Sequence, residues 1–225
     1  MDPLPPPRAQ PLGDAELVKL IGRRDPVILD IGCNDGADVL RFLGLFPACR
    51  VHAFEPDPRP RARFERTVRN SRAKLWPVAI AATDGEAEFH VSSGDPSALG
   101  HHDPARPAWD QSGSLRKPAK HVEVFPWVKF EGTMKVQTMR LDTFASQQKL
   151  RRVDFIWADV QGAEVDLIAG ATETLRITRF LYTEYSDTEL YQGQLKLREL
   201  LKLLPDFELA QRFPNDVLLR NTRIR

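Results

Sequence analysis

The sequence predicts a single α/β domain built around a parallel sheet. The chain has 225 residues, which is enough to bury one sizeable core and too few for two. The apolar run 27–31 leads through a glycine-rich turn into a run with helical spacing at 37–46. A second run, 153–159, has the nearly continuous hydrophobic character of a central parallel strand that is covered on both faces. Strand, glycine turn and helix in this order form a nucleotide-sized crevice at the carboxyl edge of a sheet.

The composition is that of an ordinary water-soluble protein, with 42% hydrophobic and 28% charged residues. Lysine and arginine total 32 against 31 aspartates and glutamates, so no overall field attracts nucleic acid or an anionic membrane. The sequence has no signal peptide, no apolar run long enough to span a bilayer, and only two cysteines, Cys33 and Cys49. We therefore expect a cytoplasmic protein with neither a membrane nor a nucleic-acid partner, and with unpaired cysteines.

The amino-terminal residues 1–13 contain five prolines and few apolar anchors. This composition cannot support a packed element, so we expect a disordered tail. Residues 14–225 are then expected to form one domain. Its first helix is predicted at 15–21, with Asp14 as the N-cap and Gly22 at the end.

The other elements follow from hydrophobic periodicity and from the turn residues between the periodic runs. Asp84-Gly85 is a hairpin signal, and the last two strands are expected to pair as an antiparallel hairpin. Further helices are predicted at 37–46, 59–70, 165–171 and 194–204, with a short helix that begins at Leu141. Strands are predicted at 27–31, 50–55, 74–80, 87–91, 122–130, 133–139, 153–159, 179–185, 207–210 and 217–220.

The segment from about residue 94 to 120 has no periodicity and is rich in proline, glycine, serine and histidine. A loop of this length inside a compact domain is either a lid or binding loop, or disordered. We favour a lid-like insertion, because Trp109 and Leu115 give the segment apolar groups with which to dock.

An acidic residue stands at the end of four predicted strands: Asp30, Glu55, Asp159 and Glu184. One such acid often only caps the following helix, but capping alone does not explain four of them. Because right-handed crossovers bring the carboxyl ends of parallel strands to one edge, these acids are expected to surround one crevice.

The glycine spacing restricts the ligand. Gly32 and Gly36 enclose three residues, and neither the dinucleotide pattern nor a phosphate-binding Gly-Lys-Ser/Thr ending is present. Asp30 in front of the turn would repel pyrophosphate but attract an ammonium group. S-adenosyl-L-methionine combines an ammonium group with a ribose, and Glu55 could accept hydrogen bonds from both ribose hydroxyls.

Three motifs in this order resemble the FkbM family of class I S-adenosylmethionine-dependent methyltransferases, and the resemblance covers residues 27–184. Ser112-Gly-Ser114-Leu115 lies between the second and third motifs. The motifs are Asp30-x-Gly32-x-x-x-Gly36 with Phe54-Glu55-Pro56, Asp84-Gly-Glu-Ala-Glu-Phe89, and Asp154-Phe-Ile-Trp-Ala-Asp159-Val-Gln-Gly-Ala-Glu164.

This resemblance implies a Rossmann-like fold with a seven-stranded, mostly parallel sheet, a C-terminal antiparallel hairpin and helices on both faces. It also implies O-methylation of hydroxyls on sugars or polyketide-type natural products. The chain departs from the family pattern at Trp157, where lysine is usual, and at Gln161, where an acid is usual. We expect the cofactor to be bound by Asp30, Gly32, Asn34, Gly36, Glu55, Pro56 and Ala79.

Methyl transfer to a sugar hydroxyl needs a general base or a divalent cation, because the hydroxyl is a very weak acid. Asp159 is the candidate for either role, and Glu184 could be a second oxygen ligand for Mg²⁺. The two carboxylates could equally hold the acceptor by hydrogen bonds. His121 is a further candidate base.

The predicted acceptor is a carbohydrate or a glycosylated small molecule, bound by Ser112, Ser114, Trp109 and Tyr185. The sequence leaves a homodimer open. Two alternatives remain: a methyltransferase that acts on RNA or protein, and a non-catalytic, cofactor-binding partner subunit. The near-neutral charge and the lack of an amino-methylation signature argue against the first of these.

Overall fold

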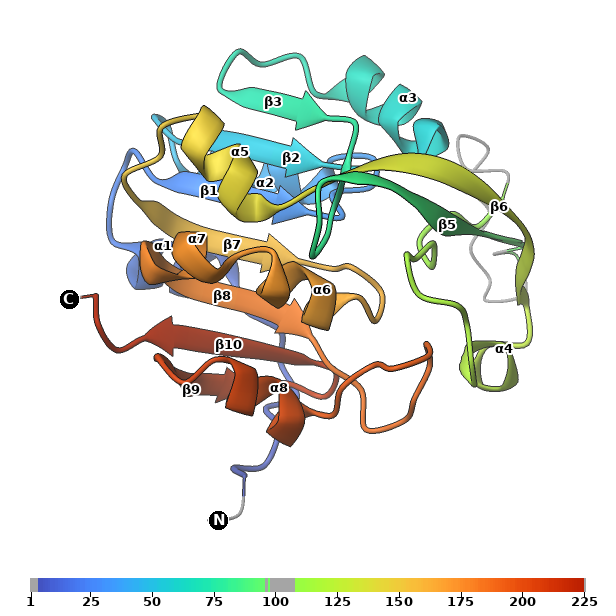
Figure 1. The fold of residues 1–225 in the computed structure, drawn as a ribbon. Helices are drawn as coiled ribbons and strands as arrows, with labels where there is room; N and C mark the ends of the chain where they lie inside the picture. Colours follow the sequence, from blue (N-terminus) through green and yellow to red (C-terminus); the bar gives the residue numbers. More distant parts are fainter. Residues whose placement is uncertain (1–3, 96, 98–107, 225) are drawn as a thin grey trace.

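The computed structural model describes residues 4–95, 97 and 108–224, and within them the main sheet has seven strands. Five strands run parallel, and the C-terminal pair forms an antiparallel hairpin (Figure 1), so the predicted sheet is confirmed. In spatial order they are β3 (Ala73–Trp76), β2 (Arg50–Phe54), β1 (Val27–Ile31), β7 (Val153–Ala158), β8 (Thr178–Glu184), β10 (Asp216–Asn221) and β9 (Phe207–Arg212).

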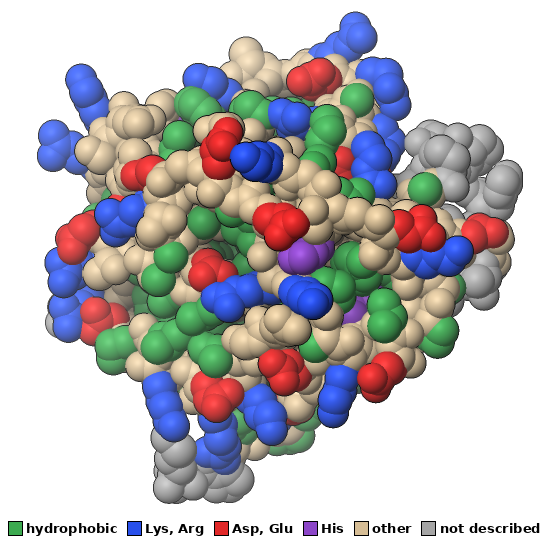
Figure 2. Space-filling view, turned by 45° about the vertical axis from the view of Figure 1, so that its right-hand side comes forward, with side chains coloured by type: hydrophobic (Ala, Val, Ile, Leu, Met, Phe, Trp, Pro, Cys, Tyr) green, Lys and Arg blue, Asp and Glu red, His purple; other side chains and the backbone are tan. Residues whose placement is uncertain are grey.

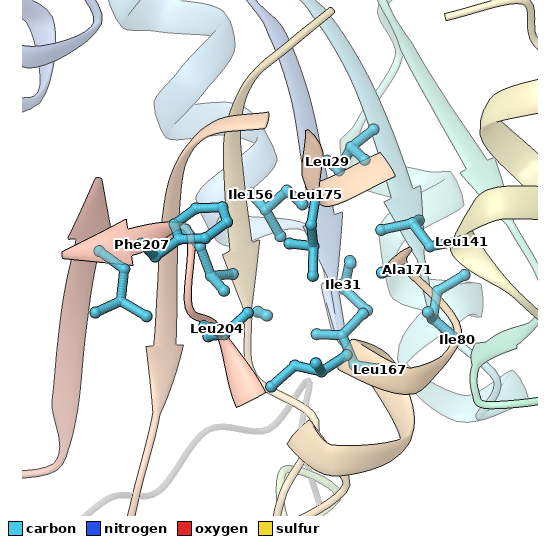
Figure 3. Packing of buried hydrophobic residues seen from close by; sticks show 14 of the residues in the cluster. Leu29, Ile31, Ile80, Leu141, Ile156, Leu167, Ala171, Leu175, Leu204 and Phe207 are labelled. Carbon is cyan, nitrogen blue, oxygen red and sulfur yellow. The ribbon is translucent and has the colours of Figure 1, made fainter. Parts of the chain in front are cut away.

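Helices cover both faces of this sheet. The alternation along β1 directs Leu29 and Ile31 to one face, where they pack with Ile156 and Leu167 (Figure 3). Ile28 points to the opposite face and joins a second apolar cluster. The first face carries α5 (Leu141–Gln147), α6 (Glu164–Ala169), α7 (Thr172–Arg176) and α8 (Leu197–Leu203); the second carries α1 (Asp14–Ile21), α2 (Ala37–Leu45) and α3 (Pro58–Thr67).

A second sheet of three strands has the order β4 (Ala79–Ile80), β6 (Val128–Met139) and β5 (Gly85–Gly94). The single strand predicted at 74–80 was wrong, because Pro77 cannot donate to a ladder and separates β3 from β4, which belong to different sheets. The predicted hairpin at Asp84-Gly85 was also wrong: β5 pairs with β6, not with β4. The Asp84 carboxylate instead accepts hydrogen bonds from the backbone of Arg140 and the hydroxyl of Thr143.

The two extended segments predicted between residues 122 and 139 are a short helix and one long strand. Helix α4 (His121–Val124) ends just before Phe125, whose helical conformation is disfavoured by the following Pro126. Strand β6 then runs without interruption through the gap that was predicted at residues 131 and 132. These elements bring the second sheet and α4 beside the carboxyl edge of the main sheet (Figure 1).

The described part of the amino-terminal segment contacts the domain. It has no helix or strand before Asp14, but Leu12 is only 3% exposed and the backbone N–H of Arg8 donates to the carbonyl of Arg212. Residues 1–3 lie outside the described part. Gly13, not Asp14, is the N-cap of α1, and the Asp14 carboxylate accepts from Arg41 instead. Where the structure describes the chain, it contains no helix that is long and apolar enough to cross a membrane.

Candidate active site

A cavity of about 700 Å³ opens at the carboxyl edge of the main sheet, a volume within the range of cofactor-binding pockets. The second sheet and residues 109–115 contribute to its walls. Hydrophobic and histidine side chains gather in the middle of the face shown in Figure 2, with charged side chains of both signs around them. The predicted site residues that line the cavity are Gly32, Asn34, Glu55, Pro56, Ala79, Trp109, Ser112, His121, Asp159, Glu184 and Tyr185.

The glycine turn after β1 is held by left-handed backbone conformations at Gly32 (φ 82°), Asn34 (φ 46°) and Gly36 (φ 84°). A Cβ atom on Gly32 would lie 1.9 Å from the carbonyl oxygen of Asp159, so only glycine lets the turn approach the end of β7. Gly36 is not part of the cavity lining. It begins α2, and a Cβ atom there would collide with the ring of Phe64 at 2.5 Å.

Asp30 does not reach the cavity surface. It is 1% exposed, faces the side of the sheet that carries α2, and lies near the carboxyl groups of Asp38, Asp159 and Glu55. Burial is the main cause that raises the pKa of Asp30 well above its ordinary value. Its Oδ2 is buried and has no hydrogen-bond partner among the described residues, so a contact between Asp30 and a ligand ammonium stays a prediction.

Glu55, directly after β2, is fixed by two backbone donors. Its Oε2 accepts from the N–H of Asn34 at 3.0 Å, and its Oε1 accepts from the N–H of Asp57 at 2.8 Å. Burial raises the pKa of this carboxyl to about 8, against the opposing effect of the two N–H donors. Each oxygen keeps a lone pair for a hydroxyl group of a ligand.

Asn34 contributes to the same end of the cavity. Its side-chain nitrogen donates to the carbonyl of Asp110 at 3.2 Å, and its Oδ1 is buried and has no hydrogen-bond partner among the described residues. A buried acceptor without a donor is costly unless a ligand or water satisfies it. The end of the cavity formed by Gly32, Asn34 and Glu55 therefore offers oxygen acceptors to a ligand with hydroxyl or amino groups.

Asp159 and Glu184 lie together at the ends of β7 and β8, as predicted. The side-chain nitrogen of Gln161 donates to both carboxyl groups, at 2.6 Å to Asp159 Oδ1 and 3.0 Å to Glu184 Oε2. Burial raises the pKa of both carboxyls, and the charge of Asp159 raises that of Glu184 further. Two carboxyls so close favour a state in which they share one proton, which leaves one carboxylate able to accept another.

Gln161 and Tyr191 extend the hydrogen-bond network of this pair, and neither residue was predicted to have a role. Tyr191 Oη lies 2.9 Å from Gln161 Oε1 and 2.8 Å from the carbonyl oxygen of Ser112. Ser114 does not line the cavity; its hydroxyl donates to the backbone carbonyl of Gln161 at 2.7 Å. The departure from the family pattern at Gln161 was the one available signal for this network, whereas nothing around Tyr191 pointed to it.

His121 lines the cavity but makes no hydrogen bond to Asp159 or Glu184. Its ring packs against Phe125, Phe130 and Tyr191, and its buried Nδ1 has no partner among the described residues. Burial lowers the pKa of this imidazole, which favours its neutral form. His121 therefore packs within an aromatic part of the cavity wall, and its role as a candidate base stays a prediction.

The predicted acceptor residues also form walls. The indole N–H of Trp109 donates to the Ser112 hydroxyl at 2.8 Å, and its ring meets Trp127 edge to face. The Tyr185 hydroxyl donates to the carbonyl of Phe213 at 2.9 Å and accepts from Arg212, so it secures the loop of the C-terminal hairpin.

The described part of the lid-like insertion is tied down on two sides. Arg63 on α3 forms an ion pair with the buried Asp110, and Ser114 exchanges two backbone hydrogen bonds with His90 on β5. Residues 96 and 98–107 of the insertion lie outside the described part of the structure.

No group of three or more histidine, cysteine, aspartate or glutamate side chains suited to a metal ion occurs in the described residues. The predicted Mg²⁺ ligands, Asp159 and Glu184, have an amide N–H donor between them. This arrangement gives the expectation of Mg²⁺ no support.

Comparisons with known proteins identify the family. A model of the FkbM methyltransferase domain matches residues 30–213. The 2-O-methyltransferase NoeI of Sinorhizobium fredii is 50% identical over 214 residues, which are 93% of this chain and 85% of that protein.

Solved structures resemble the chain more distantly. The N-terminal domain of EvdMO1 with bound S-adenosylhomocysteine aligns with a TM-score of 0.48 and 12% identity over 92% of this chain and 79% of that one. The fibrillarin/Nop5p complex aligns with a TM-score of 0.45 and 11% identity over 90% and 74%. These likenesses are too weak to bear on function, whereas the family match and the NoeI relative show that the chain belongs to the FkbM methyltransferase family and is an O-methyltransferase.

Proposed function

We propose that this O-methyltransferase transfers a methyl group from S-adenosyl-L-methionine to a hydroxyl of a carbohydrate or a glycosylated small molecule. One observation carries the proposal: the Glu55 carboxylate and the Asp159–Glu184 pair open into the same cavity of about 700 Å³. The name of the 50% identical relative, a 2-O-methyltransferase, supports a hydroxyl as the acceptor.

In this proposal the cofactor occupies the end of the cavity formed by the glycine turn. Gly32 lets the turn approach β7. Glu55 accepts a hydrogen bond from each of the two ribose hydroxyls through the lone pairs that its backbone partners leave free. Pro56, Ala79 and the unpartnered Oδ1 of Asn34 line the rest of this end. Asp30 and Gly36 do not line the cavity; they belong to the strand and the turn that position these residues. When bound, S-adenosyl-L-methionine supplies an electrophilic methyl group on a sulfonium.

The acceptor hydroxyl is proposed to meet the Asp159–Glu184 pair. The carboxylate of the pair takes the hydroxyl proton, a role for which a buried carboxyl with a raised pKa is suited. The rest of the acceptor would lie against Trp109, Ser112, His121 and Tyr185. Binding of both reactants in a fixed orientation within the cavity supplies much of the rate enhancement, because the displacement requires little further chemistry from the protein.

The remaining proposals rest on the sequence. A cytoplasmic location, the absence of nucleic-acid and membrane partners, and one domain over residues 14–225 stay proposals, and a homodimer stays open. A requirement for Mg²⁺ is tested by chelation in the experiment below.

The test is to incubate the full chain with S-adenosyl-L-methionine and methyl glycosides of fucose, rhamnose, glucose and galactose, each with a free 2-hydroxyl. Mass spectrometry should detect a gain of about 14 Da on at least one glycoside, with an equal amount of S-adenosylhomocysteine. Parallel reactions with and without EDTA detect a metal requirement.

Two other results would point elsewhere. Tight binding of S-adenosylhomocysteine without methylation of any sugar would favour the non-catalytic subunit. Methylation of RNA or protein but of no sugar would contradict the carbohydrate acceptor.

A further inference from the structure

The amide nitrogen of Gln161 lies at the point where the two catalytic carboxyl candidates converge. It is 2.6 Å from Asp159 Oδ1 and 3.0 Å from Glu184 Oε2, so each of its two hydrogens serves one carboxyl group. No other side chain in the described residues forms a hydrogen bond to both carboxyls.

The orientation of this amide is fixed by its neighbours. The amide nitrogen faces two carboxyl groups, which are acceptors when ionised, so Gln161 Oε1 lies on the other side, 2.9 Å from Tyr191 Oη. The Ser114 hydroxyl donates a hydrogen bond to the backbone carbonyl of Gln161. Gln161 itself adopts a left-handed backbone conformation with φ 50°. An uncommon backbone conformation of this kind persists only where the surroundings impose it.

We propose that the Gln161 amide takes the place of a divalent cation between Asp159 and Glu184, and that this methyltransferase works without one. The inference rests on the proposed function, in which the carboxyl pair meets the acceptor. Gln161 is then a positioning residue: it acts on the acceptor only through the two carboxyls that it bridges.

The chemistry of the gap supports this assignment. Mg²⁺ requires oxygen ligands at about 2.0–2.1 Å, whereas this gap contains two N–H groups whose positive ends would face the ion. Rotation of the amide to present its oxygen would leave both carboxyls without their N–H donor. The nearby Glu164 is buried and does not line the cavity.

A metal titration tests the inference without any acceptor. Mn²⁺ is titrated calorimetrically into the full chain, into Gln161→Glu, which replaces the donor by a carboxylate of the same shape, and into Gln147→Glu. The last variant makes the same charge change at an exposed position on α5. We expect Gln161→Glu to bind Mn²⁺ at least 10-fold more tightly than the other two proteins.

Activity gives an independent readout on the acceptor found above. EDTA should leave methylation by the unaltered chain unchanged. Gln161→Ala should lower kcat at least 10-fold with little change in the Kd for S-adenosylhomocysteine, and Gln161→Asn, whose amide is too short to bridge, should not restore it.

Two results would overturn the inference: micromolar Mn²⁺ binding to the unaltered chain that is lost in Asp159→Asn, or inactivation of the unaltered chain by EDTA. If Gln161→Glu fails to fold, judged by circular dichroism, these results on the unaltered chain still decide. If no acceptor is found, the proposed function fails while the titration still tests the inference.

Discussion

The two ends of the cavity are built from different parts of the chain. At the end proposed for the cofactor, the backbone determines the geometry: glycines in the left-handed conformation form the turn, and two backbone N–H groups orient the Glu55 carboxyl. At the end proposed for the acceptor, side chains from distant segments hold one another, as in the contacts of Gln161 with Glu184 and Tyr191. The first end is therefore sensitive to changes in backbone conformation, and the second to the loss of single polar atoms.

The largest expected effect concerns the acceptor end. Asp159→Asn removes a carboxylate while it keeps the size of the side chain, so methyl transfer should fall at least about 100-fold, as for the loss of a general base. The Kd for S-adenosylhomocysteine should change less than about 3-fold, because Glu55 and the glycine turn are untouched. Single-turnover kinetics and calorimetry measure the two quantities. An equal loss of binding and transfer would show that the two ends are not separate.

At the cofactor end, a single methyl group should act through the backbone. Gly32→Ala forces a Cβ atom against the Asp159 carbonyl at a positive φ, which should cost about 3 kcal/mol or more of unfolding free energy. Gly44→Ala is the matched control, since it lies within α2 with nothing within 4 Å of the added methyl. That variant should gain up to about 1 kcal/mol. Urea denaturation compares the two, and equal stabilities would refute the close approach.

Glu55 should determine cofactor affinity. Glu55→Ala removes an acceptor for two hydroxyls, so the Kd for S-adenosylhomocysteine should rise about 10- to 100-fold, the range for hydrogen bonds to a charged group. At saturating cofactor kcat should change little, because the carboxyl pair remains. If affinity is unaltered, the ribose does not lie on this carboxylate.

The pH dependence of binding gives a second test of Glu55. Its folded pKa of about 8 exceeds the ordinary 4.5, so its contribution to stability is present below pH 4.5 and is lost as the pH rises through 8. Ribose hydroxyls that donate to the carboxylate favour its ionised form, so binding releases a proton. Affinity for S-adenosylhomocysteine should therefore rise between about pH 6 and 8, and this rise should be absent in Glu55→Ala. Calorimetry in two buffers of different ionisation enthalpy counts the proton.

The smallest effect is expected in the amino-terminal segment, away from both ends of the cavity. Arg8 pairs with Glu16, and both side chains are more than a third exposed. Arg8→Ala should cost less than about 1 kcal/mol and leave cofactor affinity unchanged. A larger loss in urea denaturation would show that the amino-terminal segment is more than a surface contact.

The same contrast explains what could be predicted from sequence. Strand β1, its glycine turn and the acid after β2 lie within 29 residues, from Val27 to Glu55, and follow from local spacing. Asp159 and Glu184 could also be placed, since both end parallel strands. The burial of Asp30 behind the cavity lining could not be predicted, because pattern alone does not tell which face of the sheet a strand-end residue points to.

The network at the acceptor end could not be predicted, since it depends on contacts between residues far apart in the chain. Ser114 and Gln161 are separated by 47 positions, and Ser112 and Tyr191 by 79. The second sheet was missed for a related reason: β5 pairs with β6 across a long insertion, whereas the turn at Asp84-Gly85 resembles a local hairpin.

The most direct test of the account is a crystal structure of the full chain with S-adenosylhomocysteine. The account predicts both ribose hydroxyls on the Glu55 carboxylate, the sulfur directed toward Asp159 and Glu184, and the Gln161 amide still between the two carboxyls. Ribose bound away from Glu55, or a metal ion in place of the Gln161 amide, would contradict it.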